Sequence, residues 1–117
     1  MFEQFKYTKI FVDTADLNEV LRYCREPWAK GFTTNPTLMR QAEVTDYRLF
    51  VEQFQQLVPD LPISFEVVAD DLNTMARQAR TLAEWAPGAY IKIPITLCDG
   101  TSTLPLIQDL AQHRAVR

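Results

Sequence analysis

Apolar residues follow two alternating patterns along the chain. Short runs rich in β-branched and aromatic residues alternate with longer stretches in which apolar residues recur every three or four positions. Short strands joined by helices favour parallel pairing with right-handed crossovers. We therefore predict an α/β fold of four β/α units, either an open doubly wound sheet or part of a barrel. The predicted elements are strand 9–13, helix 16–24, strand 29–34, helix 45–58, strand 63–68, helix 71–86, strand 89–95 and helix 103–113.

Capping and stop residues support several of these boundaries. Asp16 with Glu19 three residues later suggests a capping box, and Asp71 is a suitable N-cap. Pro87 and Gly88 end the third helix. Because a proline disfavours helix at the residue before it, 35–36 is predicted as a turn. We find no linker and predict a single domain over residues 1–117.

Polar residues cluster where the predicted strands end. The carboxyl ends of strands are the usual ligand-binding positions in α/β proteins. Strand alternation would place the isoleucine and valine faces under the helices, and in a barrel the opposite faces would point to the centre. The polar residues are Asp13, Thr33, Thr34, Asn35, Glu66 and Lys92.

This set suits imine chemistry. A neutral lysine amine can attack a ketone and form a Schiff base, which acts as an electron sink for cleavage of a carbon–carbon bond. Carboxylates near the amine can shuttle the required protons. Lys92 is the candidate nucleophile, Asp13 and Glu66 are the candidate proton shuttles, and Asn35 could hydrogen-bond a substrate hydroxyl.

Simpler explanations exist for each residue alone. A strand lysine is commonly solvated and protects a sheet edge, and Asp13 could begin a turn or help to cap a helix. Glu66 is harder to explain structurally, because parallel strands are covered on both faces and their carboxylates are usually paired or functional. The argument for a site rests on the convergence of four strand ends.

Composition excludes several other classes. A net charge of −3 gives no sign of a nucleic-acid or membrane partner, and no apolar run is long enough to span a bilayer. We expect no signal peptide at the N-terminus. Cys24 and Cys98 lack metal-binding spacing, and His113 is the only histidine, so we predict free thiols and no metal site or catalytic triad.

Three motifs resemble one enzyme family. Segment 11–16 (FVDTAD) is similar to the segment that opens the small transaldolases and fructose-6-phosphate aldolases. Segment 31–37 (GFTTNPT) resembles their GVTTNPS/T motif, and 91–96 (IKIPIT) resembles their VKIPVT lysine strand. The stretch 99–107 is similar to the sequence after the lysine in one subgroup. The resemblance covers about residues 9–117.

The resemblance implies a TIM barrel enzyme of class I aldolase type that transfers a dihydroxyacetone unit between sugar phosphates without a metal or organic cofactor. It implies that Lys92 forms the imine, that Asp13 exchanges a proton with the substrate hydroxyl, and that Asn35, with Thr33 and Thr34 in the same motif, binds substrate. Glu66 matches the carboxylate that holds the catalytic water in transaldolases, whereas fructose-6-phosphate aldolases tend to carry glutamine. We therefore expect a transaldolase of the pentose phosphate pathway, located in the cytoplasm.

Chain length leaves the function open. A full barrel takes about 250 residues, so 117 residues supply four of eight units. Such a half-barrel would expose two sheet edges and an apolar inner face, and we expect a homo-oligomer or a complementary half-barrel chain. The alternative is an inactive truncated half-barrel that acts as a folded or oligomerising module. A weaker alternative, an open-sheet sugar- or nucleotide-binding module, lacks any Gly-rich phosphate loop.

Overall fold

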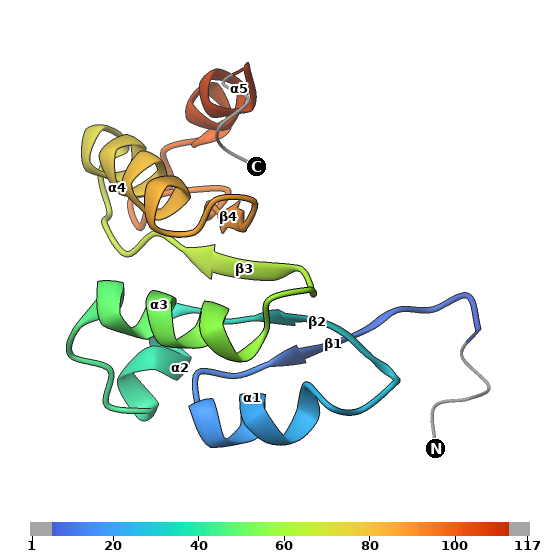
Figure 1. Ribbon diagram of the computed structural model, residues 1–117. Helices are drawn as coiled ribbons and strands as arrows, with labels where there is room; N and C mark the ends of the chain where they lie inside the picture. The colour runs from blue at the N-terminus through green and yellow to red at the C-terminus, as the bar shows by residue number, and fades with distance from the viewer. Residues whose placement is uncertain (1–5, 113–117) are drawn as a thin grey trace. The chain divides into compact units, whose positions relative to one another are not determined.

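Strands and helices alternate along the chain, as predicted. The computed structural model describes residues 6–112, and all the strand pairings described below are parallel. This confirms the predicted α/β class (Figure 1). Within the described residues the elements are β1 (Ile10–Asp13), α1 (Leu17–Tyr23), β2 (Ala29–Thr33), α2 (Pro36–Gln41), α3 (Tyr47–Leu57), β3 (Ile63–Glu66), α4 (Leu72–Trp85), β4 (Tyr90–Lys92) and α5 (Leu104–Gln112).

The chain divides into two compact units, Met1–Ile63 and Ser64–Arg117. In the first unit β1 pairs with β2, and Asp13 lies opposite Thr33 at the carboxyl ends of both strands. The backbone N–H of Phe32 donates to the carbonyl oxygen of Pro62 at 2.9 Å, which ties β2 to the segment that leads into β3.

Aromatic side chains form the core of the first unit. Phe32 on β2 and Phe50 on α3 each meet Phe54 edge to face, with ring centroids 5.7 and 5.6 Å apart. Val20 on α1 is fully buried, and α1 packs beside α3 (Figure 1). Because α3 repeats apolar residues at helical spacing, it presents one continuous apolar face to this core.

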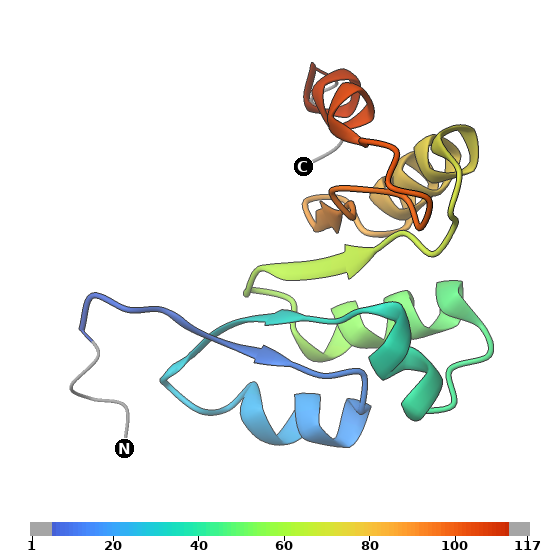
Figure 2. The same cartoon turned by 180° about the vertical axis from the view of Figure 1, so that it is seen from behind.

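The second unit is built on the β3–β4 pair. Phe65 pairs with Ile91, and Glu66 pairs with Lys92. Phe65 and Ile91 are buried, whereas Glu66 and Lys92 are partly exposed, as the strand alternation predicted. The buried face of α4 includes residues Met75, Ala79, Leu82 and Ala83, and α4 contacts both β4 and α5 (Figure 2).

Helix α2 was not predicted from the sequence. Asn35 is its N-cap, with the side-chain oxygen accepting from the N–H of Leu38 at 2.9 Å, and Pro36 begins the helix. Proline at the first helical position is favourable because its missing N–H would have no partner inside the helix. The interpretation of 35–36 as a simple turn was therefore wrong.

The second half of the chain differs from prediction in smaller ways. β3 ends at Glu66 and β4 at Lys92, earlier than expected. Ile95 is 61% exposed and so does not share the buried face of Ile91. In α5 the buried apolar residues are Leu106 and Leu110, whereas Leu104 and Ala111, which we expected to face inward, are exposed. The predicted helix end at His113 lies outside the described residues. Between residues 6 and 112 no helix is both long and apolar enough to cross a membrane.

Candidate functional site

The second unit brings together two of the predicted catalytic residues. Glu66 ends β3 and Lys92 ends β4, and the register places them directly opposite each other. Lys92 Nζ lies 3.7 Å from Glu66 Oε2, and the two side chains are 36% and 21% exposed. This separation is longer than a direct hydrogen bond and short enough for one water molecule or a small side-chain movement to connect the groups. The arrangement places a carboxylate within proton-shuttling reach of an amine.

Loops at the ends of β3 and β4 are tied to each other in the same unit. Asp70, which follows β3, accepts the N–H of Cys98 at 2.9 Å. Thr96 and Ser102 form an antiparallel bridge at the base of the loop that carries Cys98. The neighbouring Asp70 carboxylate accepts a hydrogen bond from the thiol and raises the pKa of Cys98 above its ordinary value. Cys98 is therefore a poorer nucleophile near neutral pH than an ordinary exposed thiol.

In the first unit a hydrogen bond connects two other predicted site residues. The Thr33 hydroxyl donates to Asp13 Oδ1 at 2.8 Å. The next residue, Thr14, donates its backbone N–H to the carbonyl oxygen of Thr33 at 2.9 Å, which continues the pairing beyond the strand ends. Asp13 is therefore held in one orientation by β2, with one carboxylate oxygen engaged.

Thr34 and Asn35 follow directly on β2. Thr34 is fully buried, so its hydroxyl contributes to the interior of the unit. Asn35 is partly exposed, and its side-chain oxygen caps α2. The cap fixes the orientation of the amide, and the NH₂ group is then the part of this side chain that would donate to a ligand.

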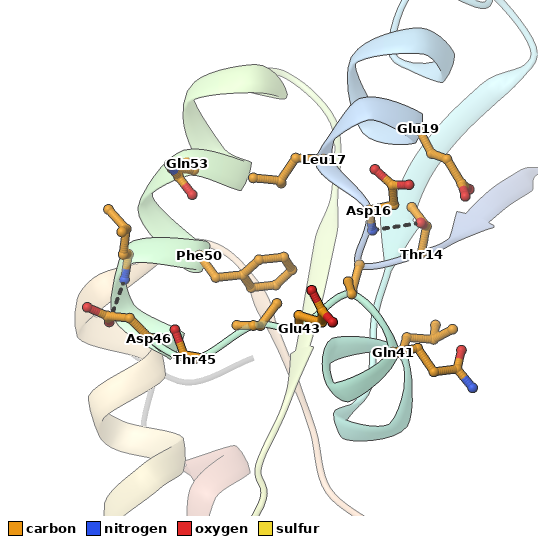
Figure 3. Close-up of a pocket in the computed structure, with 15 residues that line it drawn as sticks. Thr14, Asp16, Leu17, Glu19, Gln41, Glu43, Thr45, Asp46, Phe50 and Gln53 are labelled. Atoms are coloured by element: carbon orange, nitrogen blue, oxygen red, sulfur yellow. Dashed lines mark hydrogen bonds between the residues drawn. The ribbon is translucent and has the colours of Figure 1, made fainter.

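An open pocket of about 580 Å³ lies elsewhere in the first unit and contains none of the six predicted site residues. Figure 3 shows Phe50 directed toward the segment that carries Thr14 and Asp16. Four carboxylates line the pocket, and two of them, Asp16 and Asp46, already act as N-caps. Negative charge disfavours phosphate binding there. Between residues 6 and 112 no three His, Cys, Asp or Glu side chains are arranged to hold a metal ion.

Two residues that contact the backbone beyond Glu66 and Lys92 were missed by the sequence argument. Thr103 donates its hydroxyl to the carbonyl oxygen of Pro94. Gln78 accepts from the backbone N–H groups of Val68 and Ala69 at 2.8 and 3.0 Å. A threonine immediately before a helix is a recognisable capping signal, but a glutamine on a partly buried helix face carries no comparable local signal.

Comparison with known proteins places the chain in a family context. Residues 10–114 match the family model described as Transaldolase/Fructose-6-phosphate aldolase. A probable transaldolase of Dehalococcoides mccartyi is 40% identical over 88 residues, which cover 75% of this chain and 41% of the relative. A probable transaldolase of Roseiflexus sp. is 36% identical over 105 residues, which cover 90% of this chain and 46% of the relative.

A similar relation holds for the probable transaldolase of Streptococcus agalactiae serotype V, which is 39% identical over 88 residues. That match covers 75% of this chain and 40% of the relative. The chain thus spans between 40% and 46% of the length of these three relatives.

Proposed function

The chain belongs to the transaldolase/fructose-6-phosphate aldolase family, and from this premise we propose that Lys92 forms a Schiff base with the ketone of a sugar phosphate. The fold of the family is a TIM barrel, of which four β/α units are a part. The observation that carries the proposal is the Glu66–Lys92 contact of 3.7 Å at the carboxyl ends of two paired strands.

Imine formation requires chemistry that this pair can supply. The Lys92 amine attacks the ketone carbon and gives a carbinolamine, which loses water to form the imine. Glu66 takes a proton from the Lys92 ammonium group, directly or through one water molecule, and donates it to the carbinolamine hydroxyl, which departs as water. General acid–base assistance of this kind contributes about 100-fold to 10,000-fold in rate.

We assign roles to residues of the first unit by their resemblance to the family motifs. Asp13, oriented by Thr33, accepts the proton of the substrate hydroxyl as the carbon–carbon bond breaks, and the imine nitrogen takes up the electron pair. The Asn35 NH₂ group donates to a substrate hydroxyl, and Thr33 and Thr34 shape the same motif. The dihydroxyacetone unit left on Lys92 then adds to an acceptor aldehyde, as in the pentose phosphate pathway.

Borohydride trapping tests this proposal. The chain is incubated with fructose 6-phosphate, reduced, and analysed by intact mass and peptide mapping. We expect an adduct confined to Lys92, absent in Lys92→Ala and retained in Lys30→Ala, since Lys30 is an exposed strand lysine of the other unit. Adducts spread over all lysines, or none on a folded chain, would contradict catalysis by this chain alone.

The second candidate function is an inactive module. The observation in its favour is the exposure of Val68 and Ile95, which are 51% and 61% exposed. In that case the folded chain forms no adduct, and it binds a complementary half-barrel or further copies of itself through exposed apolar residues. Trapping is then repeated in the presence of a polypeptide that supplies the remaining length of a relative. An adduct at Lys92 only in that mixture would mean that the site needs the second half, and no adduct in either case would mean that the site is inactive.

A further inference from the structure

The backbone beyond Lys92 leaves the strand ladder early. The carbonyl oxygen of Lys92 accepts the N–H of Val67 at 3.2 Å. Two residues later stands Pro94, which has no N–H and cannot continue a ladder as a donor. The strand that carries the amine is therefore only three residues long, and something other than strand pairing must fix the segment that follows it.

Thr103 supplies that restraint. It is fully buried, and its hydroxyl donates to the carbonyl oxygen of Pro94. Its backbone N–H donates to the carbonyl oxygen of Ile95 at 3.0 Å, and its own carbonyl oxygen accepts the N–H of Ile107 at 3.0 Å inside α5. One buried side chain thus anchors the end of the lysine segment to the start of a helix.

Gln78 acts in the same way on the glutamate segment. Its side-chain oxygen accepts the N–H groups of both Val68 and Ala69, two and three residues beyond the end of β3. Gln78 is partly buried on α4, whose inner face packs in the core through Met75 and Ala79. The end of the Glu66 strand is thereby held to a helix that cannot shift without disturbing the core.

We propose that Thr103 and Gln78 are positioning residues that set the separation between Glu66 and Lys92 and so the rate of imine formation at Lys92. The effect passes through the backbone, because neither side chain reaches the reacting atoms. A displacement of about 1 Å is enough to change catalytic assistance substantially. The inference rests on the proposed function only in taking the Lys92 amine as the group that reacts.

The test uses an aldehyde that needs no aldolase activity. The 117-residue chain is treated with glycolaldehyde and cyanoborohydride, and the ratio of adduct formation at Lys92 to that at Lys30 is read by peptide mass spectrometry. Thr103→Val removes the hydroxyl at nearly constant volume, and Thr103→Ser keeps it. We expect the ratio to fall about threefold in the valine variant and to be restored in the serine variant.

A double-mutant cycle separates positioning from general loosening. In a Glu66→Gln background, Thr103→Val should have little further effect, because the carboxylate through which Thr103 acts is gone. An unchanged ratio in Thr103→Val, or an equal fall with and without Glu66, would overturn the proposal. A different outcome separates the two proposals. If the glycolaldehyde ratios change as expected but sugar-phosphate trapping gives no adduct at Lys92, the proposed function is rejected and the positioning role stands.

Gln78 provides an independent pair of variants if Thr103→Val does not fold. Gln78→Met removes the acceptor, whereas Gln78→Glu keeps an oxygen that can accept from both Val68 and Ala69. The ratio should fall in the methionine variant and be largely kept in the glutamate variant, with folding checked by circular dichroism. Equal ratios in the two variants would count against the proposal.

Discussion

Asn35 has two side-chain groups with different tasks. Its oxygen caps α2 by accepting from Leu38, and its NH₂ group is the part that we assign to the substrate. These tasks belong to opposite ends of one amide, so stability and chemistry can be separated by substitution.

Two substitutions of Asn35 test the assignment. Asn35→Asp keeps a capping oxygen and loses the NH₂ donor, so we expect normal stability and a reduced rate of sugar-phosphate adduct formation. Asn35→Ala loses both, and we expect a cost of about 1 kcal/mol in the free energy of unfolding as well. Urea denaturation and borohydride trapping measure the two quantities. Full trapping by a stable Asn35→Asp chain would show that the NH₂ group does not bind substrate.

At the scale of elements, Gly31 allows β1 and β2 to approach closely. A Cβ atom at Gly31 would stand 2.5 Å from the Phe11 ring and 2.9 Å from the carbonyl oxygen of Pro62. The ring could move, but the Pro62 oxygen belongs to the backbone and accepts a hydrogen bond from Phe32. The strand therefore requires glycine for space, which explains the glycine at the start of the 31–37 motif.

Gly31→Ala should lower the free energy of unfolding by about 1–3 kcal/mol, as overpacking does elsewhere. The double variant with Phe11→Ala relieves the ring contact and should recover only part of the loss, because the carbonyl contact remains. Urea titration of the four members of the cycle gives the coupling between the two positions. Wild-type stability of Gly31→Ala would show that the backbone adjusts without cost.

Helix α4 carries a pH-dependent cap. Asp71 accepts hydrogen bonds from the backbone N–H and the hydroxyl of Thr74, and these lower its pKa from the ordinary value of 3.8. Because the folded chain favours the charged carboxylate, the stability that Asp71 contributes is fully present above pH 3.8. It is lost as the pH falls through the lowered pKa of the folded state.

Asp71→Asn keeps an acceptor and removes the charge. We expect a lower melting temperature than wild type at pH 7 and a difference that shrinks as the pH falls below 3.8, where the wild-type carboxylate also becomes neutral. Thermal unfolding by circular dichroism at pH 7, 5 and 3 measures this. A difference that stays constant over the series would mean that the charge of Asp71 does not stabilise α4.

For the whole molecule, exposed apolar side chains are the feature to explain. Val68 and Ile95, which follow the two strands of the second unit, are 51% and 61% exposed. Tyr90 on β4 is exposed too. These exposed side chains motivate the proposal that the chain associates with a complementary half or with further copies.

Light scattering at increasing concentration should show self-association of the isolated chain. Val68→Ser should weaken it about tenfold, by removing apolar area from the contact. Leu21→Ser is the matched control, since Leu21 is 42% exposed on α1 and should have little effect. A strictly monomeric chain at all concentrations would reject self-association, and equal weakening by both variants would mean that the contact is not specific to the strand ends.

Local rules in the sequence determined most of the elements. Asp16 and Asp71 were predicted as N-caps and act as N-caps, because capping depends on one side chain and its own next turn. The alternation predicted the buried Phe65 beside Glu66 and the buried Ile91 beside Lys92, but not the exposed Ile95, since strand geometry fixes the side-chain period at two only within the strand. The polar strand ends likewise predicted that Glu66 and Lys92 would be neighbours.

Tertiary contacts decided the rest. β4 ends at Lys92, shortly before Pro94, which cannot donate to a ladder. Beyond the two strands, side chains nine or ten residues away, Gln78 and Thr103, bind the backbone groups that longer ladders would use. In α5 the buried face contains Leu106 and Leu110. Helical spacing alone is compatible with more than one apolar stripe, so the contacts within the unit decide which stripe is buried. The sequence by itself thus determined the order of the strands and of the helices other than α2, and it placed polar residues at the strand ends. Only the tertiary structure decided where the strands stop and how far Lys92 lies from Glu66, since both depend on side chains brought together by folding.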